Sequence, residues 1–171
     1  MAYVQWQHRN WRVKPLPAYA AGHVARLGSS KPSVQFDACL KLLHTSGIDL
    51  ESLATLLWQT DSDPDLMDLV SQVLEVGTVR PWRTVVALCS TLTGQWTTIQ
   101  GRMINAGVPR PLEQIGSLTA LLDAVETMIL DSQQDEKGRD TVLRQLYRGD
   151  VNEADTAPPG WEETVDLESV S

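Results

Sequence analysis

Apolar residues recur at helical spacing most strongly between residues 80 and 131. Two segments there begin at Pro81 and Pro111, and each leads into apolar positions that are mostly three or four residues apart. Between them, Gly107 followed by Pro109 is typical of a helix end. The first stripe consists of Trp82, Val85, Val86, Leu88, Cys89, Leu92, Trp96, Ile99 and Met103. The second consists of Leu118, Leu121, Leu122, Val125, Met128 and Ile129. We therefore expect a helical hairpin with a broad apolar face on each arm.

Weaker helical patterns surround this hairpin. Further helices are expected from Ser33 to Gly47, from Asp49 to about Trp58, over residues 64–77 and over residues 133–148. Ser33, Asp49 and Asp63 are the expected N-caps of the first three. Ala18–Leu27 could form one more short helix. No strand-length alternation with turn signals is apparent. The sequence thus predicts an all-α protein, a small bundle of five or six helices whose helical domain spans residues 33–149.

The two ends differ from this domain. Residues 1–32 read as an irregular basic arm, in which Pro15 and Pro17 bar a continuous helix. The arm interleaves tryptophans with arginines, at Trp6, Trp11 and Arg12 among others. Such residues could fold back onto the helical core, contact a protein partner or stack on single-stranded nucleic acid. Residues 150–171 are acidic and poor in apolar residues, so we expect a disordered tail.

Charge is distributed unevenly along the 171 residues. The net charge is −8, yet residues 1–36 carry five cations and no acid, and residues 131–171 carry a net −7. A basic head and an acidic tail could attract each other or address two different partners. The acidic total makes nucleic acid an unlikely main partner. No apolar run approaches the roughly 20 residues of a membrane span, and the N-terminus lacks a secretory pattern, so a cytoplasmic protein is expected.

No constellation of residues indicates catalysis. Cys39 and Cys89 lie on apolar helix faces and are expected to be buried free thiols. The alternating acids at Asp61 and Asp63 start like an EF-hand loop, but Leu66 stands where that loop needs glycine. The chain has no phosphate-binding glycine loop and no zinc-protease or serine-hydrolase signature. We expect a non-enzymatic protein with no metal and no cofactor.

Tryptophan and arginine are enriched at the energetic centres of protein–protein interfaces. On this basis the candidate partner-binding residues are Trp6, Trp11, Arg12, Trp58, Trp82, Arg83, Trp96 and Arg102. The four arginines of the predicted hairpin, two of them in this set, could instead be solvated or paired with Glu113 and Glu126. Gly94 and Gly101 lie seven residues apart in its first arm, which suggests a close-packing or kink role.

The hairpin also carries a family resemblance. Its sequence elements are Arg80-Pro81-Trp82, Trp96, Gly101-Arg102-Met103, Ala106-Gly107-Val108, Pro111-Leu112 and Leu118-Leu121-Leu122-Asp123. With the later Pro158-Pro159-Gly160, this order resembles the tail assembly chaperones of long-tailed, siphovirus-type actinobacteriophages. The similarity covers about half the chain and does not include the N-terminal arm.

The resemblance implies a non-enzymatic role in virion morphogenesis. Such chaperones bind the tape measure protein, help recruit tail tube subunits and leave before the virion is complete. Self-association is also possible. Two other readings stay open: a structural virion component, such as a neck or minor tail protein that clasps neighbouring subunits with its N-terminal arm, and a small regulatory or nucleic-acid-binding helical protein.

Overall fold

The computed structural model describes residues 2–59 and 65–147, and these residues are mostly helical, as the sequence predicts. Two strands begin the chain, and helices follow. The strands are β1 (Ala2–Trp6) and β2 (Arg9–Val13). The helices are a 3-10 turn η1 (Ala18–Ala20), then α1 (Ala21–Arg26), α2 (Pro32–Thr45), α3 (Leu50–Gln59), α4 (Leu66–Thr78), α5 (Trp82–Gly94), α6 (Trp96–Asn105), α7 (Pro111–Gln114), α8 (Leu118–Asp131) and α9 (Glu136–Leu146).

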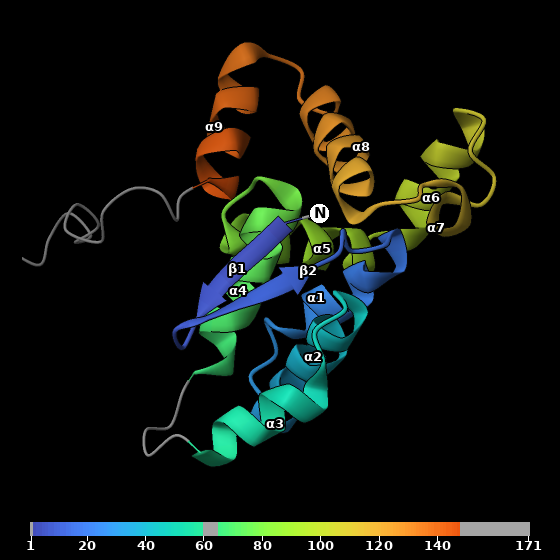
Figure 1. Cartoon of the computed structure of the whole chain (residues 1–171). Coiled ribbons are helices and arrows are strands. Elements are labelled where there is room, and N and C mark those ends of the chain that lie inside the picture. Colours follow the sequence, from blue (N-terminus) through green and yellow to red (C-terminus); the bar gives the residue numbers. More distant parts are fainter. Residues whose placement is uncertain (1, 60–64, 148–171) are drawn as a thin grey trace, which may run out of the picture.

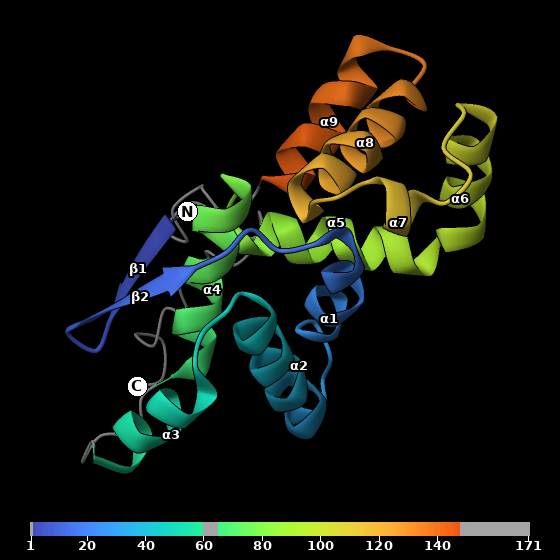
Figure 2. The same cartoon turned by 45° about the vertical axis from the view of Figure 1, so that its right-hand side comes forward.

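Helix α5 lies at the centre of the fold. It contacts α1, α4, α6, α8 and α9, and Figures 1 and 2 show α1 and α2 on one side of it with α8 and α9 on the other. Leu88 and Cys89 of α5 are fully buried. Cys39 is buried too, and both thiols are free, as expected from the sequence. The apolar stripe predicted for this segment therefore forms the middle of the core.

The N-terminal segment forms a β-hairpin, so the prediction of an irregular arm is wrong. β1 and β2 pair antiparallel, with Val4 opposite Trp11 and Tyr3 opposite Arg12. Alternation along the strands buries Val4 and Trp11 and leaves Tyr3 and Arg12 exposed. Figures 1 and 2 show the hairpin lying against α4.

The residues of the hairpin turn explain why the sequence pattern did not predict these strands. Gln7 and His8 occupy it with φ angles of 50° and 58°. Both central residues of a type I′ turn need positive φ, and Asn-Gly or Asp-Gly is the usual sequence there. Without glycine, asparagine or aspartate, this turn gave no signal, although Trp6 and Val13 extend the buried face at the expected period of two.

The first 32 residues share the core of the helical part. Trp6, Trp11, Leu16 and Val24 belong to the same cluster of buried side chains as the helices. The Leu118 N–H donates to the Leu16 carbonyl oxygen at 2.8 Å. Of the interpretations left open for this segment, the folded-back one accounts for both tryptophans.

Several helix boundaries follow sequence signals. The carboxylate of Asp49 accepts the backbone N–H groups of the first turn of α3, as its predicted capping role requires. Ser117 caps α8 in the same way. Helix α4 differs, because its cap is Asp65 and not Asp63, and α2 begins at Pro32 rather than at Ser33.

The arms of the predicted hairpin are each divided. The first splits into α5 and α6 at Gln95, whose φ of −117° and ψ of 24° lie outside the helical range. Gly94 precedes the break, in keeping with the low helix propensity of glycine. A Cβ atom added at Gly94 or Gly101 would meet nothing within 4 Å, so the close-packing role is wrong. The second arm is preceded by α7. The predicted disordered tail, residues 150–171, lies outside the described residues.

Candidate partner-binding surface

The polypeptide makes a strained turn where α4 passes into α5, here named the α4–α5 corner (residues 75–83). Val79 ends α4 in the left-handed conformation, with φ 56° and ψ 34°, and its N–H donates to the Glu75 carbonyl oxygen at 2.8 Å. Glycine is the usual residue at such a position, because a β-branched side chain is disfavoured there. The Val79 side chain is also 90% exposed. The corner thus presents an apolar side chain on a backbone that valine rarely adopts.

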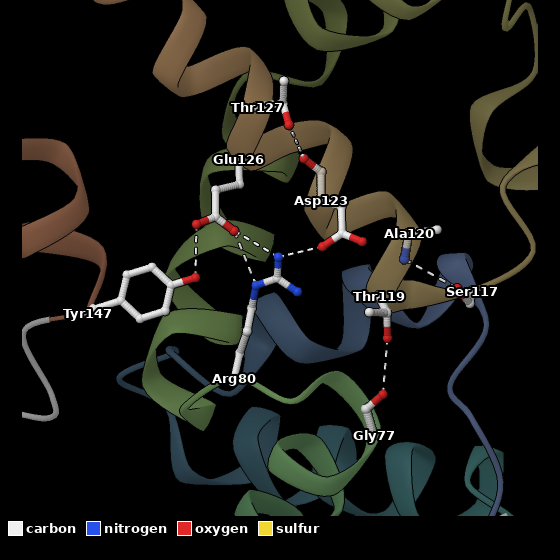
Figure 3. A network of polar contacts seen from close by, with 9 residues as sticks. All are labelled: Gly77, Arg80, Ser117, Thr119, Ala120, Asp123, Glu126, Thr127 and Tyr147. Carbon is white, nitrogen blue, oxygen red and sulfur yellow. Dashed lines mark hydrogen bonds and ion pairs between the residues drawn. The ribbon is translucent and has the colours of Figure 1, made fainter. Parts of the chain in front are cut away.

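Side chains from α8 hold this corner in place (Figure 3). The Thr119 hydroxyl donates to the Gly77 carbonyl oxygen at 3.0 Å. Arg80 donates to Glu126 from Nε at 3.2 Å and from Nη2 at 2.8 Å, and Nη2 also reaches Asp123. The Arg80 and Glu126 side chains are each only 13% exposed. Polar contacts from α8 therefore fix the corner on both sides of Val79.

The Arg80–Glu126 pair also binds the end of the described chain. Tyr147, directly after α9, donates its hydroxyl to Glu126 Oε1 at 2.8 Å. Burial lowers the pKa of Arg80, but hydrogen bonds with Asp123, Glu126 and Tyr147 outweigh it, so the net pKa lies above its ordinary value. Burial and the hydrogen bond to Glu126 raise the pKa of Tyr147. The arginine is thus charged and the phenol neutral at neutral pH.

A tryptophan–arginine pair adjoins the strained turn. The Arg83 guanidinium carbon lies 5.6 Å from the Trp82 ring centroid, within the range of a cation–π contact. Trp82 is half-buried, and its backbone N–H donates to Glu75 Oε1 at 3.2 Å. A shallow pocket of about 340 Å³ is lined by Glu75, Val79, Arg80 and Pro81. Apolar, aromatic and cationic groups are therefore gathered within nine residues of sequence.

The residue types of the α4–α5 corner are common at protein-binding surfaces. Exposed apolar side chains beside a tryptophan and an arginine are the kind of surface that anchors a protein partner. Burial raises the pKa of the Cys89 thiol to about 12, and burial with the nearby Asp65 charge raises that of Cys39. Such thiols are poor nucleophiles. No group of three or more potential metal ligands occurs within residues 2–59 and 65–147.

The other predicted partner-binding residues lie elsewhere. Trp6 and Trp11 are buried beneath the hairpin, and the Trp11 indole nitrogen donates to the Trp6 carbonyl oxygen at 3.4 Å. Arg12 is exposed on the outer face of the hairpin, and Trp58, at the end of α3, is 93% exposed.

Two more of these residues lie on α6. Trp96 is half-buried, whereas Arg102 is exposed, with Nη1 3.4 Å from the Met128 carbonyl oxygen. Of the eight predicted residues, the corner brings together only Trp82 and Arg83.

The arginines of the helical hairpin predicted from the sequence also differ in their contacts. Arg80 pairs with Glu126, and Arg110 pairs with Glu113 at 3.3 Å on an exposed surface. Arg83 covers the Trp82 ring instead.

A groove also lies between α2 and α4, and the sequence analysis did not predict it. It has a volume of about 380 Å³ and is lined by Pro32, Gln35, Phe36, Cys39, Asp65, Leu66 and Met67. Phe36 is one of the apolar residues of α2, yet it is 54% exposed. The Cys39 thiol lies 3.6 Å from the Met67 sulfur in the groove wall. A stripe of apolar residues broader than one buried face was the only sequence signal for this groove.

Among the described helices, none has the length and apolar character needed to cross a bilayer. A family of unknown function, DUF7240, matches residues 92–170, just under half of the 171 residues. That match includes α6 to α9 and begins after the α4–α5 corner. No curated protein and no solved structure matches the chain.

Proposed function

We propose that this protein is a non-enzymatic tail assembly chaperone of a long-tailed bacteriophage. It binds the tape measure protein and helps recruit tail tube subunits while the tail polymerises. It acts in the cytoplasm of the infected host and is absent from the finished virion. The basis is the sequence resemblance carried by Arg80-Pro81-Trp82 and the positions that follow it.

One observation carries the proposal. The Arg80-Pro81-Trp82 motif falls in the α4–α5 corner, where Val79 is 90% exposed and Arg83 covers Trp82. The contacts of Arg80 and Thr119 fix the backbone there before any partner binds. A preorganised surface loses less conformational freedom on binding, so a given contact area yields more affinity.

The ligand that suits this surface is an amphipathic helix. A helix offers apolar side chains at three- and four-residue spacing, which can cover an exposed valine and a tryptophan side by side. The resemblance implies that the partner is a tape measure protein, and such proteins are long and aggregation-prone. A chaperone that covers such apolar stripes would keep the segment in solution until tube subunits surround it.

Coexpression of the full chain with tape measure segments tests the proposal. The complexes would be separated by size-exclusion chromatography with light scattering, which gives their stoichiometry. A segment that precipitates alone should elute in a soluble complex with the chaperone. If every segment ignores the chain, the chaperone function is wrong. Finding the protein in purified particles would favour a structural virion component instead.

Two charge insertions locate the binding surface. Val79→Asp places a carboxylate on the corner, and aspartate tolerates the left-handed conformation, so folding should be kept. Phe36→Asp is the matched control, because it changes a 54% exposed apolar residue in the α2–α4 groove. We expect Val79→Asp to abolish the complex and Phe36→Asp to leave it intact. The reverse result would move the binding site to the groove without removing the chaperone function.

A further inference from the structure

The α2–α4 groove is an open, largely apolar space that lies apart from the α4–α5 corner. Its volume of about 380 Å³ is near the lower end of the range of about 300–1,000 Å³ that is usual for ligand pockets. Phe36 of α2 is 54% exposed there, and Leu66 and Met67 of α4 are half-buried. The groove therefore suits a bulky apolar side chain of a ligand.

The two walls of the groove are held by contacts within the chain. Asp65 caps α4, and its Oδ1 accepts the Met67 N–H at 2.8 Å. On the α2 wall, the Gln35 side chain donates to the Leu27 carbonyl oxygen at 3.0 Å. The Cys39 thiol and the Met67 sulfur join the walls at 3.6 Å. The backbone of the groove is thus fixed, while the methionine side chain can adapt to the shape of a ligand.

The segment that forms α3 and α4 is acidic. Residues 42–59 and 65–79 contain no lysine or arginine, and they contain the acids Asp49, Glu51, Asp65, Asp68 and Glu75. Asp65 lines the groove, and Asp68 is exposed in the first turn of α4. Asp68 accepts from the neutral Gln72 amide at 3.2 Å, which does not cancel its charge. Lys31, beside Pro32 on the other wall, offsets one of these charges. The α4 side of the groove is therefore negative.

This charge restricts the class of ligand. Nucleic acids and anionic lipid surfaces carry dense negative charge, which an acidic groove repels. Residues 150–171 of the chain itself contain seven acids and no lysine or arginine, so the same repulsion applies to them. A protein segment with basic and bulky apolar side chains matches both the acids and the groove. An amphipathic helix presents both kinds of side chain at fixed spacing.

The groove and the α4–α5 corner lie at opposite ends of α4. The helix begins at Leu66, beside the groove, and ends at Thr78, within the corner. These two residues are roughly 18 Å apart along the helix axis. Figures 1 and 2 show α4 extending from the segment after α3 to the start of α5. A ligand in the groove therefore leaves the corner accessible.

We propose that the α2–α4 groove binds a basic amphipathic segment of another protein. An apolar side chain of that segment lies between Phe36 and Met67, and its lysines or arginines lie beside Asp65 and Asp68. The inference does not depend on the proposed chaperone function, because no residue of the α4–α5 corner takes part.

A designed peptide tests the class of ligand on the full-length protein. The probe is a fluorescein-labelled amphipathic peptide of lysine and leucine, about 14 residues or four helical turns long. Fluorescence anisotropy should show saturable binding of this probe. The same peptide with glutamate in place of lysine should not bind. Failure of the lysine–leucine peptide to bind, or equal binding of both peptides, would overturn the proposal.

NMR titration with the lysine–leucine peptide locates the contact. The amide signals of Gln35, Phe36, Leu66 and Met67 should shift most. Shifts confined to residues 75–83 would assign the basic segment to the corner, and uniform shifts over the whole surface would mean non-specific adhesion. Either result contradicts the proposed site.

Paired charge variants test the acids. Asp65→Asn with Asp68→Asn removes both charges and keeps the cap of α4, because asparagine caps helices about as well as aspartate. The peptide should bind roughly three- to tenfold more weakly, as expected for the loss of two exposed ion pairs. Asp135→Asn with Asp140→Asn is the matched control, because Asp135 caps α9 in the same way. Equal affinities of the two double variants would contradict a role for the groove acids.

An apolar variant tests the groove itself. Phe36→Ala should weaken peptide binding about tenfold, as is typical of an aromatic anchor. Tyr19→Ala changes an aromatic residue of similar exposure, 59% against 54%, and should leave the affinity unchanged. Light scattering of the chain alone distinguishes another occupant. Dimers that Phe36→Ala dissociates would assign the groove to a second copy and overturn the proposal.

Discussion

At the scale of single residues, Val79 combines two unfavourable features. Its backbone is in the left-handed region, and its side chain is 90% exposed and so gains little from packing. Left-handed backbone costs an ordinary L-residue roughly 1–2 kcal/mol. A strained residue on the surface is a recognised indication of function, because stability alone would favour glycine there.

Substitution of this valine should stabilise the fold. Val79→Gly is expected to raise the free energy of unfolding by about 1 kcal/mol, part of the strain relief being offset by the entropy of glycine in the unfolded chain. Val76→Gly, three residues earlier within α4, should instead destabilise by roughly 0.5 kcal/mol, because glycine is a poorer helix former than valine. Urea denaturation followed by circular dichroism measures both. Equal effects of the two substitutions would contradict the strain at position 79.

Residue type alone did not separate binding residues from core residues. Trp6 is 4% exposed and Trp58 is 93% exposed, although both were grouped as partner-binding candidates. The difference arises from β pairing, which places Trp6 on the buried face of β1, and from the position of Trp58 at the end of α3. Neither cause is visible in the identity of a residue or its immediate neighbours.

At the scale of elements, α9 depends on a few polar contacts. No residue of this helix is buried. Tyr147 donates to Glu126, Leu146 accepts from Thr84, and Arg139 lies 3.8 Å from Asp131. The position of α9 is therefore sensitive to the protonation of the Tyr147 hydroxyl.

The contribution of Tyr147 should disappear at alkaline pH. Its folded pKa is raised above the ordinary 10.0, so the neutral phenol is favoured in the folded state. The resulting stability is fully present below 10.0 and is lost as pH rises through the folded pKa. Tyr147→Phe should cost about 1–2 kcal/mol at neutral pH. The difference between wild type and variant in urea denaturation should vanish well above pH 10.0. A difference that stays constant with pH would show that the hydroxyl does not act through Glu126.

The helices could be predicted from sequence because their signals are local. Three signals act within a few residues of the helix that they define. They are the apolar spacing, Asp49 as an N-cap and Gly107 as a helix stop. The hairpin was missed because Gln7 and His8 form a tight turn without the usual residues. The corner was found only in part. Trp82 and Arg83 were candidates. The left-handed conformation of Val79 had no sequence signal, because glycine is the usual residue at such a position. The Thr119 side chain that bonds Gly77 lies 42 positions away in the sequence.

At the scale of the whole molecule, one core joins the hairpin to the helices. Val4 and Trp11 are packed in the same cluster as Leu88 and Leu122. A backbone hydrogen bond between residues 16 and 118 adds a second connection. The first 32 residues and the helical domain therefore share the contacts on which both depend.

This shared core should give a single unfolding unit. In native-state hydrogen exchange, the buried amides of Val4 and Trp11 should open with the same free energy as those of Leu88 and Leu122. The amide of Leu143 in α9 is the internal comparison and should open at lower free energy, because no α9 side chain is fully buried. A hairpin that exchanges as readily as α9 would mean that it folds independently.

The hydrogen bond between residues 16 and 118 also sets an order of events on the ribosome. Trp6 and Trp11 leave the exit tunnel long before α8, which ends at Asp131, has been made. At translation rates of about 5–20 residues per second, the core that contains these tryptophans is completed only when α8 has been made, roughly 6–25 s after the tryptophans themselves. During that interval the nascent chain exposes aromatic surface that the finished protein buries. The yield of protein from the cell should therefore depend on the speed of synthesis, in addition to the stability of the native state.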